Sequence, residues 1–174
     1  MNTLLQTLYG YHAWANMELF NTLENVNREK NGTELQTSLQ LISHYYVVSR
    51  IFAGHLQGLS HGFTSDNLEE TPTLDELKAL VTSSDQWYLD YLRKVSPPTL
   101  AEAVAFTFTD GDQGYMTRGE MLLHVALHAT VHRGEVCRIL SQLSIMPPWE
   151  TLAVHLHQSE PTRRLEAART LTPA

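Results

Sequence analysis

The chain has 174 residues, of which 43% are apolar and 18% charged, and its net charge is −7 with the histidines counted as neutral. This composition is typical of a globular domain, and the acidic balance argues against a nucleic-acid partner, which requires a basic surface. Cys137 is the single cysteine, and we find neither a signal-peptide pattern nor the ~18-residue apolar run of a membrane-spanning helix, so we expect a cytoplasmic protein with no internal disulfide and no membrane partner.

The first two predicted elements are helices. Apolar residues recur at helical spacing from the start of the chain and predict a helix over residues 2–25. A polar loop, NVNREKNG, follows. Thr33 and Gln36 then form a capping-box pattern, which predicts a second helix from about residue 33 to residue 59.

A third helix and a hairpin come next. Thr73 and Glu76 repeat the capping-box pattern and predict a helix over residues 74–95, which Pro97-Pro98 stops. In AVAFTFTDGDQGYM the apolar period changes to two, and DGDQG has the composition of a turn. This stretch therefore predicts a short β-hairpin.

The last elements are again helical. Thr117 and Glu120 form a third capping-box pattern, which predicts a helix over residues 118–143. A short helix is expected over residues 149–158. Residues 159–174 have little apolar surface to bury, so we expect a tail that is mobile or draped on the surface.

Four long amphipathic helices in a chain of this length predict an all-α fold, a four-helix bundle in one domain over residues 1–158. The short loop between the first two helices predicts that they are antiparallel neighbours. The connection over residues 60–72 reaches ~43 Å when extended, which allows a crossover along the whole bundle. The connection that contains the hairpin allows a second crossover.

Three histidines on the last long helix, His124, His128 and His132, are spaced four residues apart and share one face. Imidazoles one turn apart can bind the same metal ion, but His124 and His132 are separated by ~12 Å along the helix axis. An ion therefore takes either the first pair or the second. The pattern alone also fits histidines that are hydrogen-bonded in a core.

Neighbouring residues favour the pair of His128 and His132. Glu135 lies on the same stripe, and Gly134 within a helix usually marks the close approach of another backbone, which would bring a further ligand near. A catalytic metal usually has three protein ligands and an open position. The candidates for the third ligand are His12, His55 and His44, and we favour His44 because a histidine in apolar surroundings needs a partner.

Three motifs together resemble the DinB family of damage-inducible four-helix-bundle metalloproteins. HATVHRGEV at residues 128–136 resembles the signature of the family's last long helix, YHAWANMEL at 11–19 resembles its opening, and LISHYYVVSRIF at 41–52 resembles its second-helix motif. The similarity extends over about residues 5–150. It departs after the last long helix, where relatives often have an aspartate just after the prolines and this chain reads PPWETLAVHLH.

This resemblance implies a bundle with crossover connections and a divalent metal ion held by His44, His128 and His132. Zinc or nickel is the expected ion, and iron, copper or manganese are alternatives. The resemblance also implies a homodimer and a transferase that uses a low-molecular-weight thiol as co-substrate to attack a small-molecule electrophile.

Two further residues have a predicted part in that chemistry. Glu135 is expected to orient an imidazole or to act as a base, and Arg133 to pair with a carboxylate of the thiol. The alternatives are a metal-dependent hydrolase, a non-catalytic metal-binding or stress-response dimer, and a purely structural histidine cluster.

Overall fold

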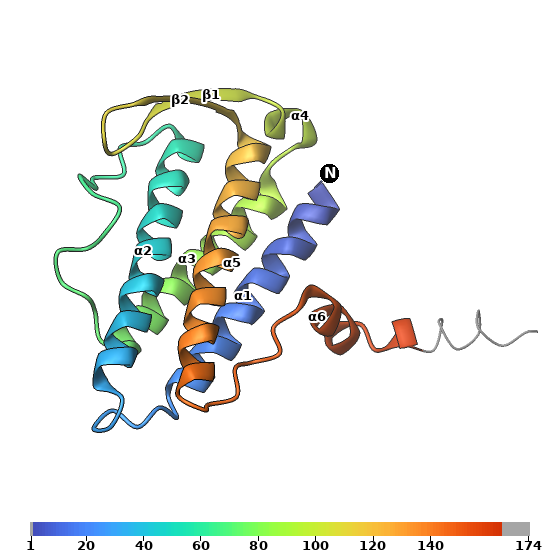
Figure 1. The fold of residues 1–174 in the computed structure, drawn as a ribbon. Helices are drawn as coiled ribbons and strands as arrows, with labels where there is room; N and C mark the ends of the chain where they lie inside the picture. The colour runs from blue at the N-terminus through green and yellow to red at the C-terminus, as the bar shows by residue number, and fades with distance from the viewer. Residues whose placement is uncertain (1, 165–174) are drawn as a thin grey trace, which may run out of the picture.

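The structure, a computed structural model, describes residues 2–164 and confirms the predicted all-α four-helix bundle with a short hairpin and a short C-terminal helix (Figure 1). Residues 165–174 of the expected tail lie outside the described residues. The four long helices are α1 (Asn2–Leu23), α2 (Gly32–Gln57), α3 (Leu74–Lys94) and α5 (Arg118–Gln142). The short elements are α4 (Pro97–Leu100), β1 (Ala103–Thr107), β2 (Gln113–Thr117) and α6 (Leu152–Ser159).

The long helices form a four-cornered bundle in which α2 packs on α3 and α5, and α1 packs on the same two helices. Helices α1 and α2 therefore occupy opposite corners, so the prediction that they are neighbours is wrong. A short loop can still join them, because neighbouring helix axes are 8–10 Å apart and a diagonal is only about 14 Å.

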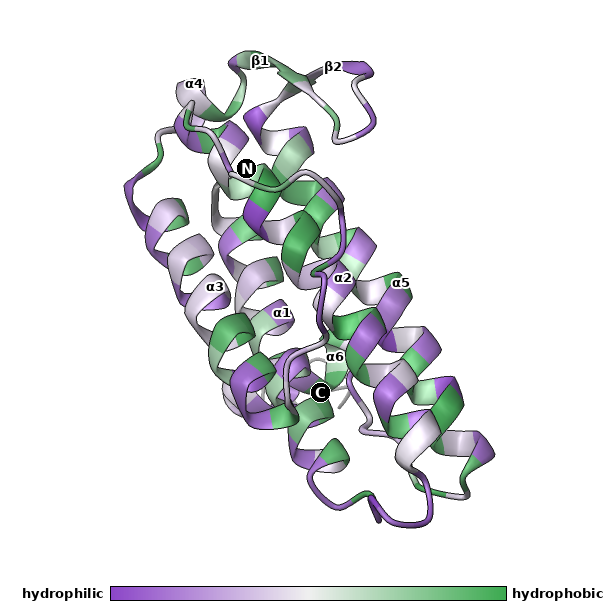
Figure 2. Ribbon diagram, turned by 90° about the vertical axis from the view of Figure 1, so that its left-hand side faces the viewer, coloured by the Kyte–Doolittle hydropathy of each residue, from purple (hydrophilic) through white to green (hydrophobic). Residues whose placement is uncertain are grey.

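The connection over residues 58–73 is the predicted crossover. Helices α2 and α3 point in the same direction, so the chain runs back along the bundle between them (Figures 1 and 2). The connection from α3 to α5 stays at one end of the bundle, where it forms α4 and the β1–β2 hairpin (Figure 1). Both connections lie near the C-terminal end of α2.

Side-chain capping explains where two of the helices begin. Thr73 and Thr117 each accept a hydrogen bond from the backbone N–H of the glutamate three residues later, and that glutamate accepts one in return, as the sequence predicts. The expected box at Thr33 is wrong, since α2 begins at Gly32 behind Asn31 and has no side-chain cap. There the tertiary packing of α2 determines the start of the helix.

The hairpin closes the end of the bundle through one aromatic side chain. Phe106 on β1 is buried in the apolar core at that end. Its ring lies against Gly114 on β2, where an added Cβ would come within 2.3 Å of the ring. Only glycine fits at that position, so the pair sets how the hairpin lies over α2 and α5. Within residues 2–164, none of the helices combines the length and apolar character that crossing a membrane requires.

Candidate metal centre

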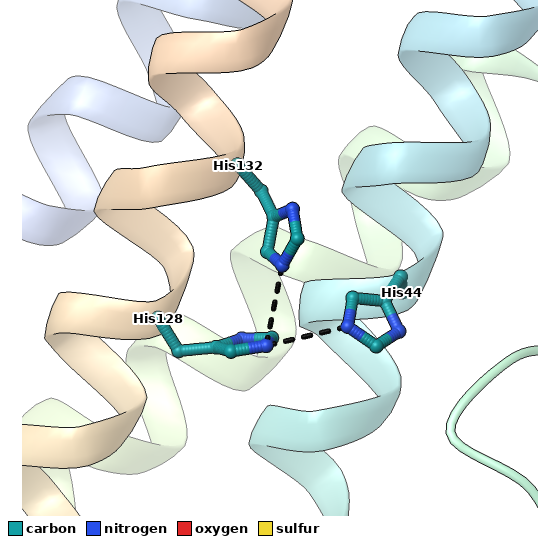
Figure 3. A group of neighbouring side chains, drawn as sticks. All are labelled: His44, His128 and His132. Atoms are coloured by element: carbon teal, nitrogen blue, oxygen red, sulfur yellow. Dashed lines mark hydrogen bonds between the residues drawn. The ribbon is translucent and has the colours of Figure 1, made fainter.

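Three imidazoles meet between α2 and α5. His44 comes from α2, and His128 and His132 from successive turns of α5 (Figure 3). The Nε2 atom of His128 lies 3.3 Å from that of His44 and 3.2 Å from that of His132. One ring nitrogen from each of the three residues lies within 4.8 Å of the other two. The structure thus brings together the three residues that the family resemblance implied.

The outer nitrogens of two of these rings have hydrogen-bond acceptors. His44 Nδ1 lies 3.0 Å from the backbone carbonyl oxygen of Asp66, and His132 Nδ1 lies 2.7 Å from Oε2 of Glu135. A carbonyl and a carboxylate can only accept, so both Nδ1 atoms donate. With Nδ1 as the donor, the lone pair of each imidazole is on Nε2, directed towards the cluster.

His128 is neutral at physiological pH. Burial, followed by the neighbouring histidines His132 and His44, lowers its pKa to about 4. Without a positive charge, its Nε2–H can donate to one of the two facing lone pairs at most. At least one of the two short contacts then brings two nitrogen lone pairs together with no proton between them. A cation bound by all three nitrogens would remove this repulsion.

The distances suit a first-row divalent cation. Zinc binds imidazole nitrogen at 2.0–2.1 Å, so tetrahedral ligands lie about 3.3 Å apart. The two contacts of His128, at 3.3 and 3.2 Å, match this spacing. Three imidazoles, two of which have hydrogen-bonded outer nitrogens, form the donor set of a metal site that keeps an open position. The cluster and its environment fit a metal-binding protein.

A cavity of about 260 Å³ adjoins the cluster. His44 and His128 form one end of it, so an ion held there would face the cavity rather than the helix core. The remaining wall comes from α2, from α5 and from the two connections that meet at this end of the bundle: Val48, Ile51, Phe52, His55, Asp66, Phe108, Thr109, Asp110 and His124.

The other histidine candidates have different surroundings. His124 and His55 line the cavity but are not part of the cluster. His12 is buried at the interface of α1 and α3, where its Nε2 lies 3.2 Å from Asp85. The expectation of close packing at Gly134 is wrong, because no atom would meet a Cβ there.

Arg133 has a setting that the sequence did not predict. It follows His132 directly, but its side chain is completely buried on the side of α5 that faces α1. The guanidinium donates to Oε2 of Glu150 at 3.0 Å and to Nδ1 of His12, with two further bonds. It does not line the cavity, so the expected contact with a carboxylate of a thiol has no support in the geometry.

The network around Arg133 links α5 to three other parts of the chain. Asn16 on α1 accepts from the guanidinium and donates to Asp85 on α3. Glu150 belongs to the segment after α5, and its backbone carbonyl accepts from Tyr11. Burial raises the pKa of Glu150 while Arg133 opposes the rise. The network therefore holds α5 in register with α1 and α3, directly behind the histidine cluster.

Sequence reasoning missed two residues that matter here. Asp66 contributes a backbone carbonyl, which any residue type could supply, so no sequence signal marks it. Glu150 had a signal: it stands two positions after the prolines, close to where relatives of the resembled family often have an aspartate. A carboxylate after the prolines thus pairs with the buried arginine.

Comparison with known proteins agrees with the structure. The profile of the DinB family matches residues 1–164. The "Protein DinB" of Bacillus subtilis (strain 168) is 27% identical over 147 residues, which cover 78% of this chain and 83% of that protein. No solved structure matches. The chain belongs to the DinB family.

Replacing Arg133 by methionine should lower the free energy of unfolding by about 3–5 kcal/mol, because the largely buried carboxylate of Glu150 loses its partner. Urea denaturation followed by circular dichroism measures this. The matched control is Arg138→Met, at an exposed position of the same helix, with an expected change below about 0.5 kcal/mol. Glu150→Gln is the milder variant should Arg133→Met not fold, and a wild-type stability for either variant would contradict the proposed structural role.

Proposed function

We propose that this DinB-family protein is a divalent-metal-dependent enzyme that activates a low-molecular-weight thiol for attack on a small electrophile. The observation that carries the proposal is the convergence of three Nε2 atoms beside a cavity. The thiol is proposed from the family resemblance, which implies thiol-dependent transferases and isomerases.

In this proposal His44, His128 and His132 hold the ion. Three imidazoles suit zinc, nickel, copper or iron, and zinc or nickel is the ion we propose. A bound ion would act as a Lewis acid that lowers the pKa of a thiol at an open position. The chain's own thiol does not serve this purpose. Burial raises the pKa of Cys137 to about 11, and its Sγ faces Glu150 rather than the cavity.

Glu135 acts as a positioning residue in this proposal. Its carboxylate accepts from His132 Nδ1 at 2.7 Å, which fixes the orientation of the ring and the nitrogen that stays unprotonated. Such partners typically change metal affinity or activity about 10- to 100-fold when they are removed. Glu135 does not line the cavity, so its support for the reaction passes through His132.

We also propose that the protein forms a homodimer through an apolar groove between α1 and α5. The groove has a volume of about 580 Å³. Its α5 wall continues into a stripe of exposed side chains one turn apart, Leu123, Leu127 and Val131, and Leu4 on α1 is 72% exposed beside it. A twofold axis through such a patch would pair it with its own copy and cover the apolar surface.

The metal site is tested by elemental analysis of protein purified from metal-replete medium. We expect one divalent ion per chain, and less than about a tenth of that in His128→Ala, since two ligands on separate helices rarely retain an ion. His124→Ala is the control, because His124 lies on the same stripe outside the cluster, and it should keep the full stoichiometry. A metal-free wild type that does not take up zinc, nickel or manganese would refute the proposal.

The reaction is tested by following the loss of thiol in the presence of chlorodinitrobenzene. We expect turnover by the wild type and none by His128→Ala. Glu135→Gln should need about 10- to 100-fold more metal for half-maximal rate and should recover at saturating metal, as a positioning residue does. Turnover that survives His128→Ala and His132→Ala would overturn the mechanism, while stoichiometric metal without turnover would leave a metal-binding protein.

The dimer is tested by light scattering coupled to size-exclusion chromatography. Leu127→Glu places a charge in the proposed interface, and we expect a dimeric wild type to become monomeric. Leu59→Glu is the matched control, because Leu59 is 61% exposed, compared with 59% for Leu127, but lies beyond the end of α2, outside the groove. A wild type that is monomeric at all concentrations would contradict this proposal.

A further inference from the structure

The cavity beside the cluster has a wall rich in aromatic rings. Phe52 on α2 lies 4.7 Å from the ring of His124 and 5.7 Å from that of His55, measured between centroids. Phe108, at the hairpin turn, also lines the cavity and is 42% exposed. Flat apolar surfaces of this kind favour a flat ring as ligand.

The charged side chains that line the cavity are all of one sign. Asp66 from the crossover and Asp110 from the hairpin turn line it, and both are exposed. No lysine or arginine is found among the described lining residues. Arg133, whose position in the sequence is next to a cluster histidine, is held on the other side of α5 by Glu150. A carboxylate, phosphate or sulfonate entering the cavity would meet two carboxylates and no cationic side chain.

One polar atom of the wall has no partner. Nε2 of His55 is buried and is without a hydrogen bond to any described residue. The rings of Phe52, Phe106 and His61 surround His55 and offer it no strong acceptor. An unpaired buried polar atom is unfavourable, and a hydrogen bond to a polar group of a ligand would satisfy it.

We infer that this cavity binds a small, single-ring aromatic molecule that carries no negative charge, with its ring between Phe52 and Phe108 and any positive group at Asp66 and Asp110. The inference rests on the proposed function in one respect: the bound ring would belong to the electrophile that the thiol attacks. The volume of about 260 Å³ lies below the 300–1,000 Å³ of sites for drug-sized ligands. This limits the ligand to about one ring and a short substituent.

Three single-ring probes test the inference: the cation benzyltrimethylammonium, the neutral benzyl alcohol and the anion benzenesulfonate. None of them is a strong ligand for a metal ion, so their affinities report the cavity walls. Equilibrium titrations followed by NMR would use the full-length protein as purified and again after addition of zinc. We expect the cation and the alcohol to bind at least about three-fold more tightly than the sulfonate without added zinc. The difference should narrow after addition of zinc, because the charge of the ion opposes that of Asp66 and Asp110.

Two variants with matched controls locate the binding. Phe108→Ala should weaken the cation and the alcohol about two- to ten-fold by removing an aromatic wall, whereas Tyr115→Ala, exposed on the same hairpin and outside the cavity, should not. Asp110→Asn should weaken only the cation, about two- to five-fold. Asp112→Asn removes the same charge from the same turn but does not line the cavity, and it should have no effect.

The outcomes separate this inference from the proposed function. A sulfonate that binds as tightly as the cation without added zinc, no measurable binding of any probe, or binding unaffected by Phe108→Ala would overturn the inference. The last of these would place the rings elsewhere, such as in the groove between α1 and α5. Metal content and thiol turnover are measured independently, so the predicted order of affinities without turnover would refute only the proposed function.

Discussion

The packing of α2 against α5 is the constraint on which the site depends. These helices run in opposite directions and share more of their length than most other pairs in the bundle. His44 therefore meets His128 and His132 at one level, while His55, further along α2, meets the earlier part of α5 near His124. A shift of half a helical turn, about 2.7 Å, would already exceed the ~2 Å length of a bond between an imidazole nitrogen and a metal ion. The register of this pair has to be accurate to a small fraction of a turn.

Two neighbouring residues of α5 have separate roles in the site, one in the cluster and one in fixing the position of the helix. His132 faces α2 and belongs to the cluster, whereas Arg133 faces α1 and is completely buried in a polar network. A buried guanidinium is stable only where its donors are satisfied, and Glu150, His12, Asn16 and Thr130 satisfy them in a single arrangement. Sliding α5 against α1 would break the bonds to His12 and Asn16 together. The network thus contributes to the site through position, although it touches neither the cluster nor the cavity.

Local sequence predicts the secondary structure and part of the site, whereas the arrangement of the helices depends on tertiary packing. The helices, the hairpin and the capping boxes at Thr73 and Thr117 follow from periodicity and local hydrogen bonding, which a sequence displays directly. Spacing along α5 showed that one ion could take only two of its three histidines. The apolar surroundings of His44 favoured it over His12 and His55 as their partner, and the family resemblance implied the same residue. The diagonal arrangement of α1 and α2 and the inward direction of Arg133 depend on tertiary packing. Gly134 misled because glycine in a helix does not always mark a close contact.

The topology explains why a cavity exists beside the cluster at all. A bundle with only short loops would leave the α2–α5 seam open to solvent along one side. Here the crossover brings Asp66 to His44, where its carbonyl orients the ring, and the hairpin brings Phe108 and Asp110 over the same seam. Both connections leave the bundle at the end where α2 stops, so they meet over the part of the seam that adjoins the histidines (Figures 1 and 2). Loops tolerate substitution better than helices do. A ligand preference set by Asp66, Phe108 and Asp110 can therefore change without disturbing the three imidazoles, whose positions belong to the helices.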